Sequence, residues 1–158
     1  MVLVVDSSES IGARNFEKVK NFIKNLLKTA DIDGGKVRVG INVYSTYDEV
    51  AFNLNTFTSK ADIFSAIDSL SYKGNGTNTG LALETMRTEM FTDANGDRAN
   101  VRNVAFVITD GEHDDNPIPE ADAARDDGVH IYAIGVELED MGEIEGIADK
   151  PWVKRFFC

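Results

Sequence analysis

Three separate stretches of the chain carry oxygen-bearing side chains that could together hold a metal ion. Asp6, Ser8 and Ser10 occupy alternate positions directly after an apolar run. Thr77 lies in a glycine-rich stretch, and Asp110 follows a second apolar run. All five side chains offer hard oxygen donors, which suit Mg²⁺, Mn²⁺ or Ca²⁺ and suit zinc or copper poorly. We therefore expect a divalent cation here, Mg²⁺ in the first place, with Mn²⁺ or Ca²⁺ as alternatives.

The charge of this donor set indicates what the metal could do. Two carboxylates and three hydroxyls only just neutralise a divalent ion, and the direct shell is almost neutral if the carboxylates act through water. Such an electron-poor metal would take an anionic oxygen from outside, for example from an Asp or Glu of a protein ligand. Because no residue is obviously placed as a general base beside the metal, adhesion is favoured over hydrolysis. We expect a protein that is not an enzyme and has no catalytic residues.

Each motif also has a plainer interpretation. An isolated Asp-x-Ser-x-Ser sequence is more often the N-cap of a helix, but Thr77 and Asp110 at matching strand ends favour the metal site. The stretch Gly74–Gly80 lacks the spacing of a dinucleotide-binding fingerprint and does not follow the first strand. The stretch Asp93–Asp97 has its Gly out of register for an EF-hand loop, so we interpret it as an ordinary turn.

The elements that must position these residues alternate between strands and helices. Continuous apolar runs at Val2–Val5, Val104–Ile108 and Val129–Val136 are typical of strands buried on both faces. Strict alternation predicts strands at Val37–Val43 and Val50–Leu54, and the short turn between them makes the second an antiparallel edge strand. The remaining expected elements are helices at Arg14–Ala30, from Thr58 or Ser59 to Leu70, at Leu81–Phe91, Pro117–Asp127 and Met141–Ala148, and a last strand at Trp152–Phe157.

This order predicts an α/β fold, with a doubly wound, mainly parallel central sheet, one antiparallel edge strand and helices on both faces. In such sheets the functional crevice lies at the carboxyl ends of the strands. We therefore expect the stretches Asp6–Ser10, Gly74–Gly80 and Asp110–Asp115 to meet at this edge.

Composition narrows the class of protein. The chain has 158 residues, enough for one domain over 1–158 and not for two. Its 16 basic and 27 acidic residues give a net charge of −11, which argues against nucleic acid as a partner. No apolar run approaches the ~20 residues of a membrane span. Acids gather in Asp110–Asp127 and Glu137–Asp149, and they form either a solvated face or a surface that attracts cations.

Three motifs, in order along the chain, closely resemble those of the von Willebrand factor type A domain. They are Asp6-Ser7-Ser8-Glu9-Ser10, Gly76-Thr77-Asn78-Thr79-Gly80 and Ile108-Thr109-Asp110-Gly111-Glu112. The resemblance covers nearly the whole chain. It is strongest with extracellular-matrix members, of the matrilin and collagen type VI kind, and with their invertebrate relatives in shells and byssal threads. It implies the family's Rossmann-like fold and a metal-ion-dependent adhesion site.

The resemblance also implies a role for each site residue. Ser8 and Ser10 bind the ion directly through their hydroxyls. Thr77 binds it directly or through water, and Asp6 and Asp110 act largely through water and hydrogen bonds. The rim that contacts the ligand is expected to include Glu9, Asn78 and His113. Glu9 departs from the small residues that are common at its position.

These implications make the chain an extracellular, secreted adhesion module. Its partners would be matrix proteins, such as collagen or another protein with this domain. Family members usually continue into a long final helix, and we expect this chain to be a fragment of a longer one. Either the final helix is missing from it or this member of the family ends differently, and a sheet face left uncovered would favour self-association. Cys158 could pair with a thiol outside the chain, and the glycosylation sequence Asn75-Gly76-Thr77 is expected to be unoccupied.

Two other functions stay open at this point. The chain could be an acidic structural module that assembles matrix or associates with mineral or calcium, in which case the metal site is incidental. It could also be an intracellular domain of this family in an ATP-driven or repair complex, although the terminal Cys and the matrix-like loops argue against that.

Overall fold

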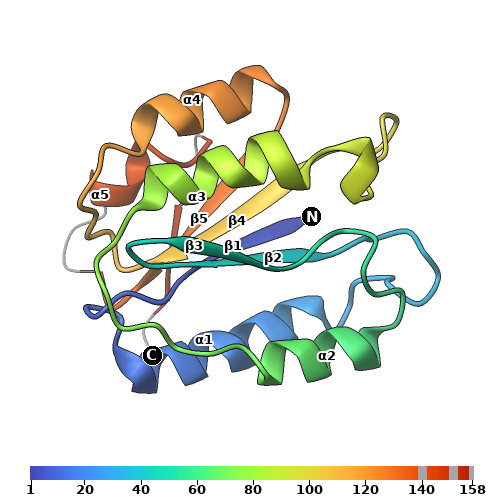
Figure 1. The fold of residues 1–158 in the computed structure, drawn as a ribbon, viewed down its shortest axis with the longest axis horizontal. Helices are drawn as coiled ribbons and strands as arrows, with labels where there is room; N and C mark the ends of the chain where they lie inside the picture. The colour runs from blue at the N-terminus through green and yellow to red at the C-terminus, as the bar shows by residue number, and fades with distance from the viewer. Residues whose placement is uncertain (139–141, 150–152, 157–158) are drawn as a thin grey trace.

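The central sheet of the computed structural model has six strands within residues 1–138, 142–149 and 153–156, which the structure describes (Figure 1). The strands lie in the order β3-β2-β1-β4-β5-β6, and of these β3 alone runs antiparallel to its neighbour. Their bounds are β1 Val2–Asp6, β2 Gly40–Tyr44, β3 Asp48–Phe52, β4 Val104–Thr109, β5 His130–Val136 and β6 Val153–Phe156. This arrangement confirms the predicted fold class.

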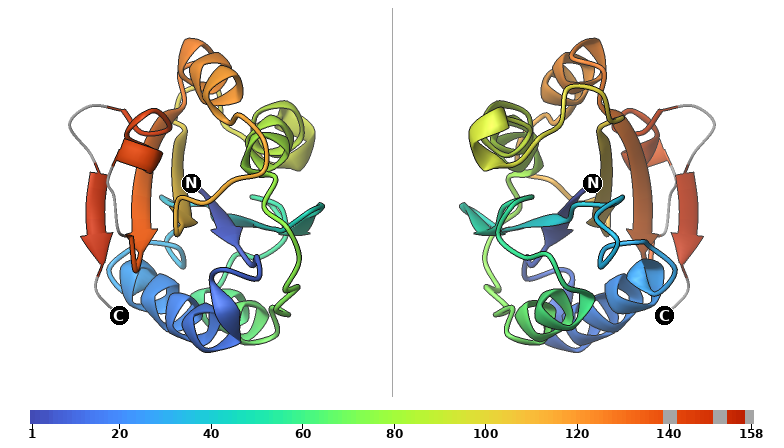
Figure 2. Two further views of the ribbon diagram at one scale, coloured as in Figure 1. Left: turned by 90° about the vertical axis from the view of Figure 1, so that its left-hand side faces the viewer. Right: turned by 90° about the vertical axis from the view of Figure 1, so that its right-hand side faces the viewer.

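Helices cover both faces of the sheet. α1 (Gly12–Leu27) and α2 (Lys60–Asp68) lie on one face, and α3 (Thr79–Thr85) and α4 (Ile118–Asp126) lie on the other. The short α5 (Gly142–Glu145) packs its Ile144 near Ala133 of β5. Figure 2 shows the two helical layers on opposite sides of the sheet.

The middle strands are apolar on both faces because each face meets a helical layer. In β1, Leu3 and Val5 belong to the core cluster under α1, whereas Val2 and Val4 belong to the cluster under α3. All four side chains are fully buried, and a strand buried on both sides requires a continuous apolar run. Asp6 is therefore the first polar residue of the chain, and it stands where β1 leaves the space between the layers.

Several observed boundaries differ from the predicted ones. The strand expected from Val37 begins at Gly40, and α1 begins at Gly12 and ends at Leu27, before the predicted Ala30. The helix expected over Leu81–Phe91 is α-helical only as far as Thr85 and continues as a π-helical turn at Met86–Met90. Apolar spacing alone does not distinguish a wider turn from an α-helical one, because the same side of the helix stays buried in both.

Two local predictions are confirmed. Ser59 is the N-cap of α2, since its hydroxyl accepts a hydrogen bond of 3.1 Å from the backbone N–H of Asp62. The stretch Asp93–Asp97 is a turn that contains a short 3₁₀ helix at Asp93–Asn95. Met141, Trp152, Phe157 and Cys158, which the predictions included, lie outside the described residues.

Phe16 of α1 is the buried aromatic that we expect to matter most for the packing of this helix. Its side chain is fully buried, and its ring centroid lies 5.9 Å from that of Tyr72. Phe16→Ala should lower the free energy of unfolding by about 3–5 kcal/mol, measured by urea denaturation. Phe22→Ala, on a half-buried position of the same helix, is the matched control and should cost clearly less. Equal losses would contradict this account of the core.

Candidate metal site

The carboxyl ends of β1 and β4 meet where the strand order reverses. β2 and β3 lie on one side of β1, and β4, β5 and β6 lie on the other. Asp6 ends β1, and Asp110 follows Thr109, the last residue of β4. Connections leave such a switch point in opposite directions and open a crevice there. The fold therefore brings the first and third predicted motifs together.

The first loop turns back on itself around the carboxylate of Asp6. This side chain is 1% exposed, and its Oδ1 accepts a hydrogen bond of 2.8 Å from the backbone N–H of Ser8. The turn brings the hydroxyl oxygens of Ser8 and Ser10 to within 3.1 Å of each other. No side chain caps the N-terminus of α1, whose N-cap residue is Ile11. The two serine hydroxyls are thus paired with each other, and the helix-cap interpretation of this motif is not supported.

The Thr77 loop, residues 74–80, is hydrogen-bonded to the first motif and to Thr46, through backbone groups and through the side-chain amide of Asn78. The backbone N–H of Glu9 donates to the carbonyl of Asn75 at 2.8 Å, which joins the loop to the first motif. On the other side the Thr46 hydroxyl accepts from the N–H of Gly76 at 3.0 Å, and the Thr46 carbonyl accepts from the Asn78 amide at 2.7 Å. Thr77 itself is 6% exposed. The structure therefore places this predicted ligand at the same edge as the first motif.

The third loop is coupled to the first by the hydroxyl of Thr109. This hydroxyl donates to Oδ2 of Asp6 at 2.8 Å and accepts from the N–H of Gly111 at 3.0 Å. Asp110 is half-buried, and its Oδ1 accepts from the N–H of Glu112 at 3.2 Å. A cavity of about 230 Å³ opens beside the site; it is lined by Ser10, Ile11, Asn15, Asp110, Glu112, Val136 and Glu137.

Burial makes the charge of Asp6 costly. It raises the pKa of this carboxyl from 3.8 to about 6, against the opposing effect of the hydrogen bonds from Ser8 and Thr109, and the nearby charge of Asp110 adds to the rise. Beneath it, the pKa of the fully buried Tyr44 hydroxyl is raised well above its ordinary value by burial, with the charge of Asp6 adding to the effect. A cation in the crevice would offset both the burial cost and the repulsion between the two carboxylates.

The donor set fits a divalent cation that binds hard oxygen ligands. Hydroxyls of two serines already face each other, a carboxylate adjoins them, and a second carboxylate comes from the neighbouring strand end. Within the described residues there is no cluster of three or more His, Cys, Asp or Glu that could hold a metal. The oxygen atoms that this edge of the sheet offers come from hydroxyls as well as carboxylates.

The predicted rim residues lie in different settings. Glu9 and His113 are exposed, whereas the side chain of Asn78 is half-buried and donates to the Thr46 carbonyl. Tyr47, on the turn between β2 and β3, was not predicted and is 79% exposed. This exposed aromatic lies near the Thr77 loop, because it directly follows Thr46, which is hydrogen-bonded to that loop.

Sequence reasoning also missed residues that hold the loops in place. Thr109 could have been found, since it directly precedes the predicted Asp110 at a strand end. Asp114 and Asp115, which accept hydrogen bonds from the Thr77 loop, belong to a stretch that was expected at this edge of the sheet, but nothing marked their individual roles. Their partners are backbone N–H groups distant in sequence, and no side-chain pattern marks these.

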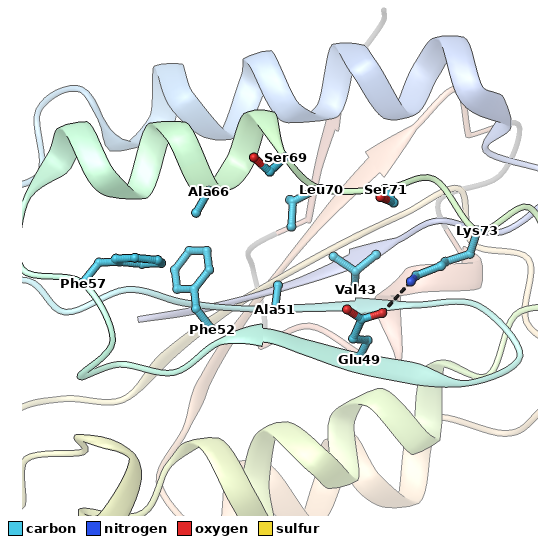
Figure 3. Close-up of a pocket in the computed structure, with 10 residues that line it drawn as sticks. All are labelled: Val43, Glu49, Ala51, Phe52, Phe57, Ala66, Ser69, Leu70, Ser71 and Lys73. Atoms are coloured by element: carbon cyan, nitrogen blue, oxygen red, sulfur yellow. Dashed lines mark hydrogen bonds and ion pairs between the residues drawn. The ribbon is translucent and has the colours of Figure 1, made fainter.

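A second cavity, of about 240 Å³, lies away from the strand ends, between β3 and α2 (Figure 3). Apolar side chains such as Phe52, Phe57 and Leu70 line it, and the ion pair of Lys73 with Glu49 closes one end. It contains none of the predicted metal ligands.

A doubly wound sheet with hydroxyl and carboxylate side chains gathered at its switch point defines a class of α/β domain. The chain belongs to the von Willebrand factor type A domain family, whose model matches residues 1–158. It is 41% identical over 151 residues to the collagen alpha-6(VI) chain of Mus musculus, covering 96% of this chain and 7% of that protein. It is 34% identical over 160 residues to matrilin-3 of Mus musculus, covering 99% of this chain and 33% of that protein. The chain thus spans a third or less of these relatives.

Solved structures agree with the resemblance to matrix members of the family. A structure of proximal thread matrix protein 1 from the mussel byssus matches with a TM-score of 0.91 and 28% identity, covering 99% of this chain and 42% of that one. Another structure of that protein has a zinc-occupied MIDAS motif and matches with a TM-score of 0.89 and 27% identity, covering 98% of this chain and 42% of that one. Zinc, which the donor types of this chain were expected to suit poorly, thus occupies the MIDAS motif of that protein.

In the described part of this chain, no helix is long and apolar enough to cross a membrane.

The raised pKa of Asp6 predicts a specific pH dependence for the metal-free protein. The folded state favours the protonated carboxyl, so the stabilising contribution of this one group is fully present below pH 3.8 and is lost as the pH rises to about 6. The difference corresponds to roughly 3 kcal/mol. Asp6→Asn imitates the protonated form, and in EDTA its stability relative to the wild type should increase across this window and level off above it.

Urea denaturation at several pH values measures this difference, and Asp93→Asn, at an exposed position, controls for the loss of one carboxylate. A difference between wild type and Asp6→Asn that does not change with pH would contradict the assigned burial cost.

Proposed function

We propose that this domain is a non-enzymatic extracellular adhesion module that binds a matrix protein through a divalent cation. The convergence of the Ser8 and Ser10 hydroxyls beside the buried carboxylate of Asp6 carries the proposal. Its relatives are collagen and matrilin chains, which supports an extracellular matrix setting. Mg²⁺ is the proposed ion, with Mn²⁺ or Ca²⁺ as alternatives.

The hydrogen bonds of the site support a division of roles among its residues. Both carboxylate oxygens of Asp6 already accept hydrogen bonds from Ser8 and Thr109, which favours an indirect role through water. Ser8 and Ser10 would bind the ion directly, Thr77 directly or through water, and Asp110 mainly through water. The cation would supply Lewis acidity toward one external carboxylate.

The surface around the ion would then meet the partner. Glu9 and His113 are exposed at the edge of the site, and Tyr47 adds an exposed aromatic on the neighbouring turn. Tyr side chains contribute strongly to protein interfaces because they combine apolar area with a polar group. The acid of Glu9 would strengthen the attraction of the cation and weaken the approach of an acidic ligand.

Metal binding can be tested without any partner. Isothermal titration with Mg²⁺ should detect binding to the wild type, and Ser10→Ala and Asp110→Ala should each weaken it by roughly tenfold or more, since each removes a group of the site. Asp93→Ala, exposed and remote in sequence from every site motif, is the control and should bind as the wild type does. Unchanged affinity in both site variants would rule out this site.

Partner binding should require the metal if the coordination mechanism is correct. On a biosensor coated with collagen VI or a matrilin, the domain should bind in Mg²⁺ and lose binding in EDTA or after Asp110→Ala. Full affinity under either condition would overturn the mechanism, though not the fold.

The net charge of −11 favours one second candidate, an acidic structural module that associates with calcium or mineral. Calcium association that survives Asp6→Ala would support that module and make the metal site incidental.

A further inference from the structure

Two consecutive carboxylates, Asp114 and Asp115, hold the Thr77 loop from the side of the third motif. Oδ2 of Asp114 accepts from the backbone N–H of Thr77 at 2.7 Å, and the Asp114 N–H donates to the carbonyl of Thr77 at 2.8 Å. Oδ2 of Asp115 accepts from the N–H of Gly80 at 2.7 Å. Both peptide groups that flank the Cα atom of Thr77 are therefore bonded to one residue, Asp114.

The glycines of this loop make room for the two carboxylates. A Cβ atom at Gly76 would lie 2.5 Å from Oδ2 of Asp114, and one at Gly80 would lie 2.6 Å from Oδ2 of Asp115. Cβ atoms essentially never approach another heavy atom this closely. The glycines at these two positions are thus needed for the close approach of Asp114 and Asp115.

Asp115 bonds to Gly80 through one carboxylate oxygen, while its other carboxylate oxygen has no partner in the part of the chain that the structure describes. Oδ1 of Asp115 is buried and has no hydrogen-bond partner among the described residues. An unpaired buried oxygen costs free energy, so a residue of purely structural use would be expected to turn this atom toward water. Asp114 and Asp115 also form the hydrogen bonds that join the loop after Asp110 to the Thr77 loop.

We propose that Asp114 and Asp115 form a clasp that positions Thr77 for the cation, without contacting the cation themselves. This inference rests on the proposed metal-binding function. Thr46 and Ser45 hold the opposite side of the loop, since the Ser45 carbonyl accepts from the N–H of Asn78 at 2.8 Å. Loss of the clasp would therefore leave the loop attached and the Thr77 hydroxyl poorly placed.

The test compares variants that remove the acceptor with variants that keep it. Asp114→Ala and Asp115→Ala should each weaken Mg²⁺ binding roughly tenfold or more in isothermal titration, the usual effect of losing a group that orients a metal ligand. Asp114→Asn and Asp115→Asn keep an oxygen that can accept the same N–H, and they should recover most of the affinity. Asp126→Ala removes one exposed charge from α4, away from the three loops, and should change the affinity little.

Thermal unfolding distinguishes positioning from general stabilisation. A positioning role predicts that the Ala variants lose much of the rise in Tm that Mg²⁺ produces over EDTA. A merely structural role would lower Tm equally in both conditions. Should an Ala variant not fold, Gly80→Ala displaces the Asp115 carboxylate with every charge in place, and it should weaken Mg²⁺ binding as well.

The possible results separate this proposal from the one on which it rests. If the wild type binds no Mg²⁺, the proposed function fails and the clasp fails with it. If the wild type binds Mg²⁺ and the folded Ala variants bind it equally well, the clasp alone is overturned. Equal weakening by Asp126→Ala would also overturn it, because the effect would then come from net charge.

Discussion

The buried carboxylate of Asp6 is the constraint on which the rest of the site depends. A carboxylate that is 1% exposed needs hydrogen-bond donors or a positive charge to remain ionised. Ser8 and Thr109 supply two donors, yet the pKa of Asp6 still stands at about 6. A positive charge at the switch point of the sheet would therefore stabilise the ionised form of Asp6. The carboxylate is buried because β1 runs between two helical layers before it ends at this residue.

The neighbouring loops are held in place mainly by hydrogen bonds to their backbone groups. Thr109 links the first and third loops through its hydroxyl, and the Thr77 loop is bonded to the first motif, to the turn after β2 and to Asp114. Loops held in this way keep their shape without a packed apolar core of their own. Hydroxyl donors are weak metal ligands individually, so their value lies in being placed together before the ion arrives.

Much of this arrangement could be predicted from sequence, and the reason lies in periodicity. Continuous apolar runs identify β1, β4 and β5, and the residue that ends each run falls at the functional edge of the sheet, which is how Asp6 and Asp110 were found. The π-helical turn at Met86–Met90 was not predictable, because burial of the same face hides the change in helix geometry. The contacts of Asn78 with Thr46 and of Asp114 with Thr77 were also beyond reach, since backbone N–H and carbonyl groups are present at almost every position.

The acidic stretch after Asp110 shows what a charge count alone conceals. A run of acids is most simply interpreted as a solvated face, and Glu112 and Asp114 are indeed exposed. Asp114 and Asp115 nevertheless direct carboxylate oxygens at backbone N–H groups of the Thr77 loop. Part of the net charge of −11 therefore holds a loop in place, which a count of charges does not reveal. The same carboxylates add negative potential near the crevice, so the groups that hold the Thr77 loop would also favour the proposed cation.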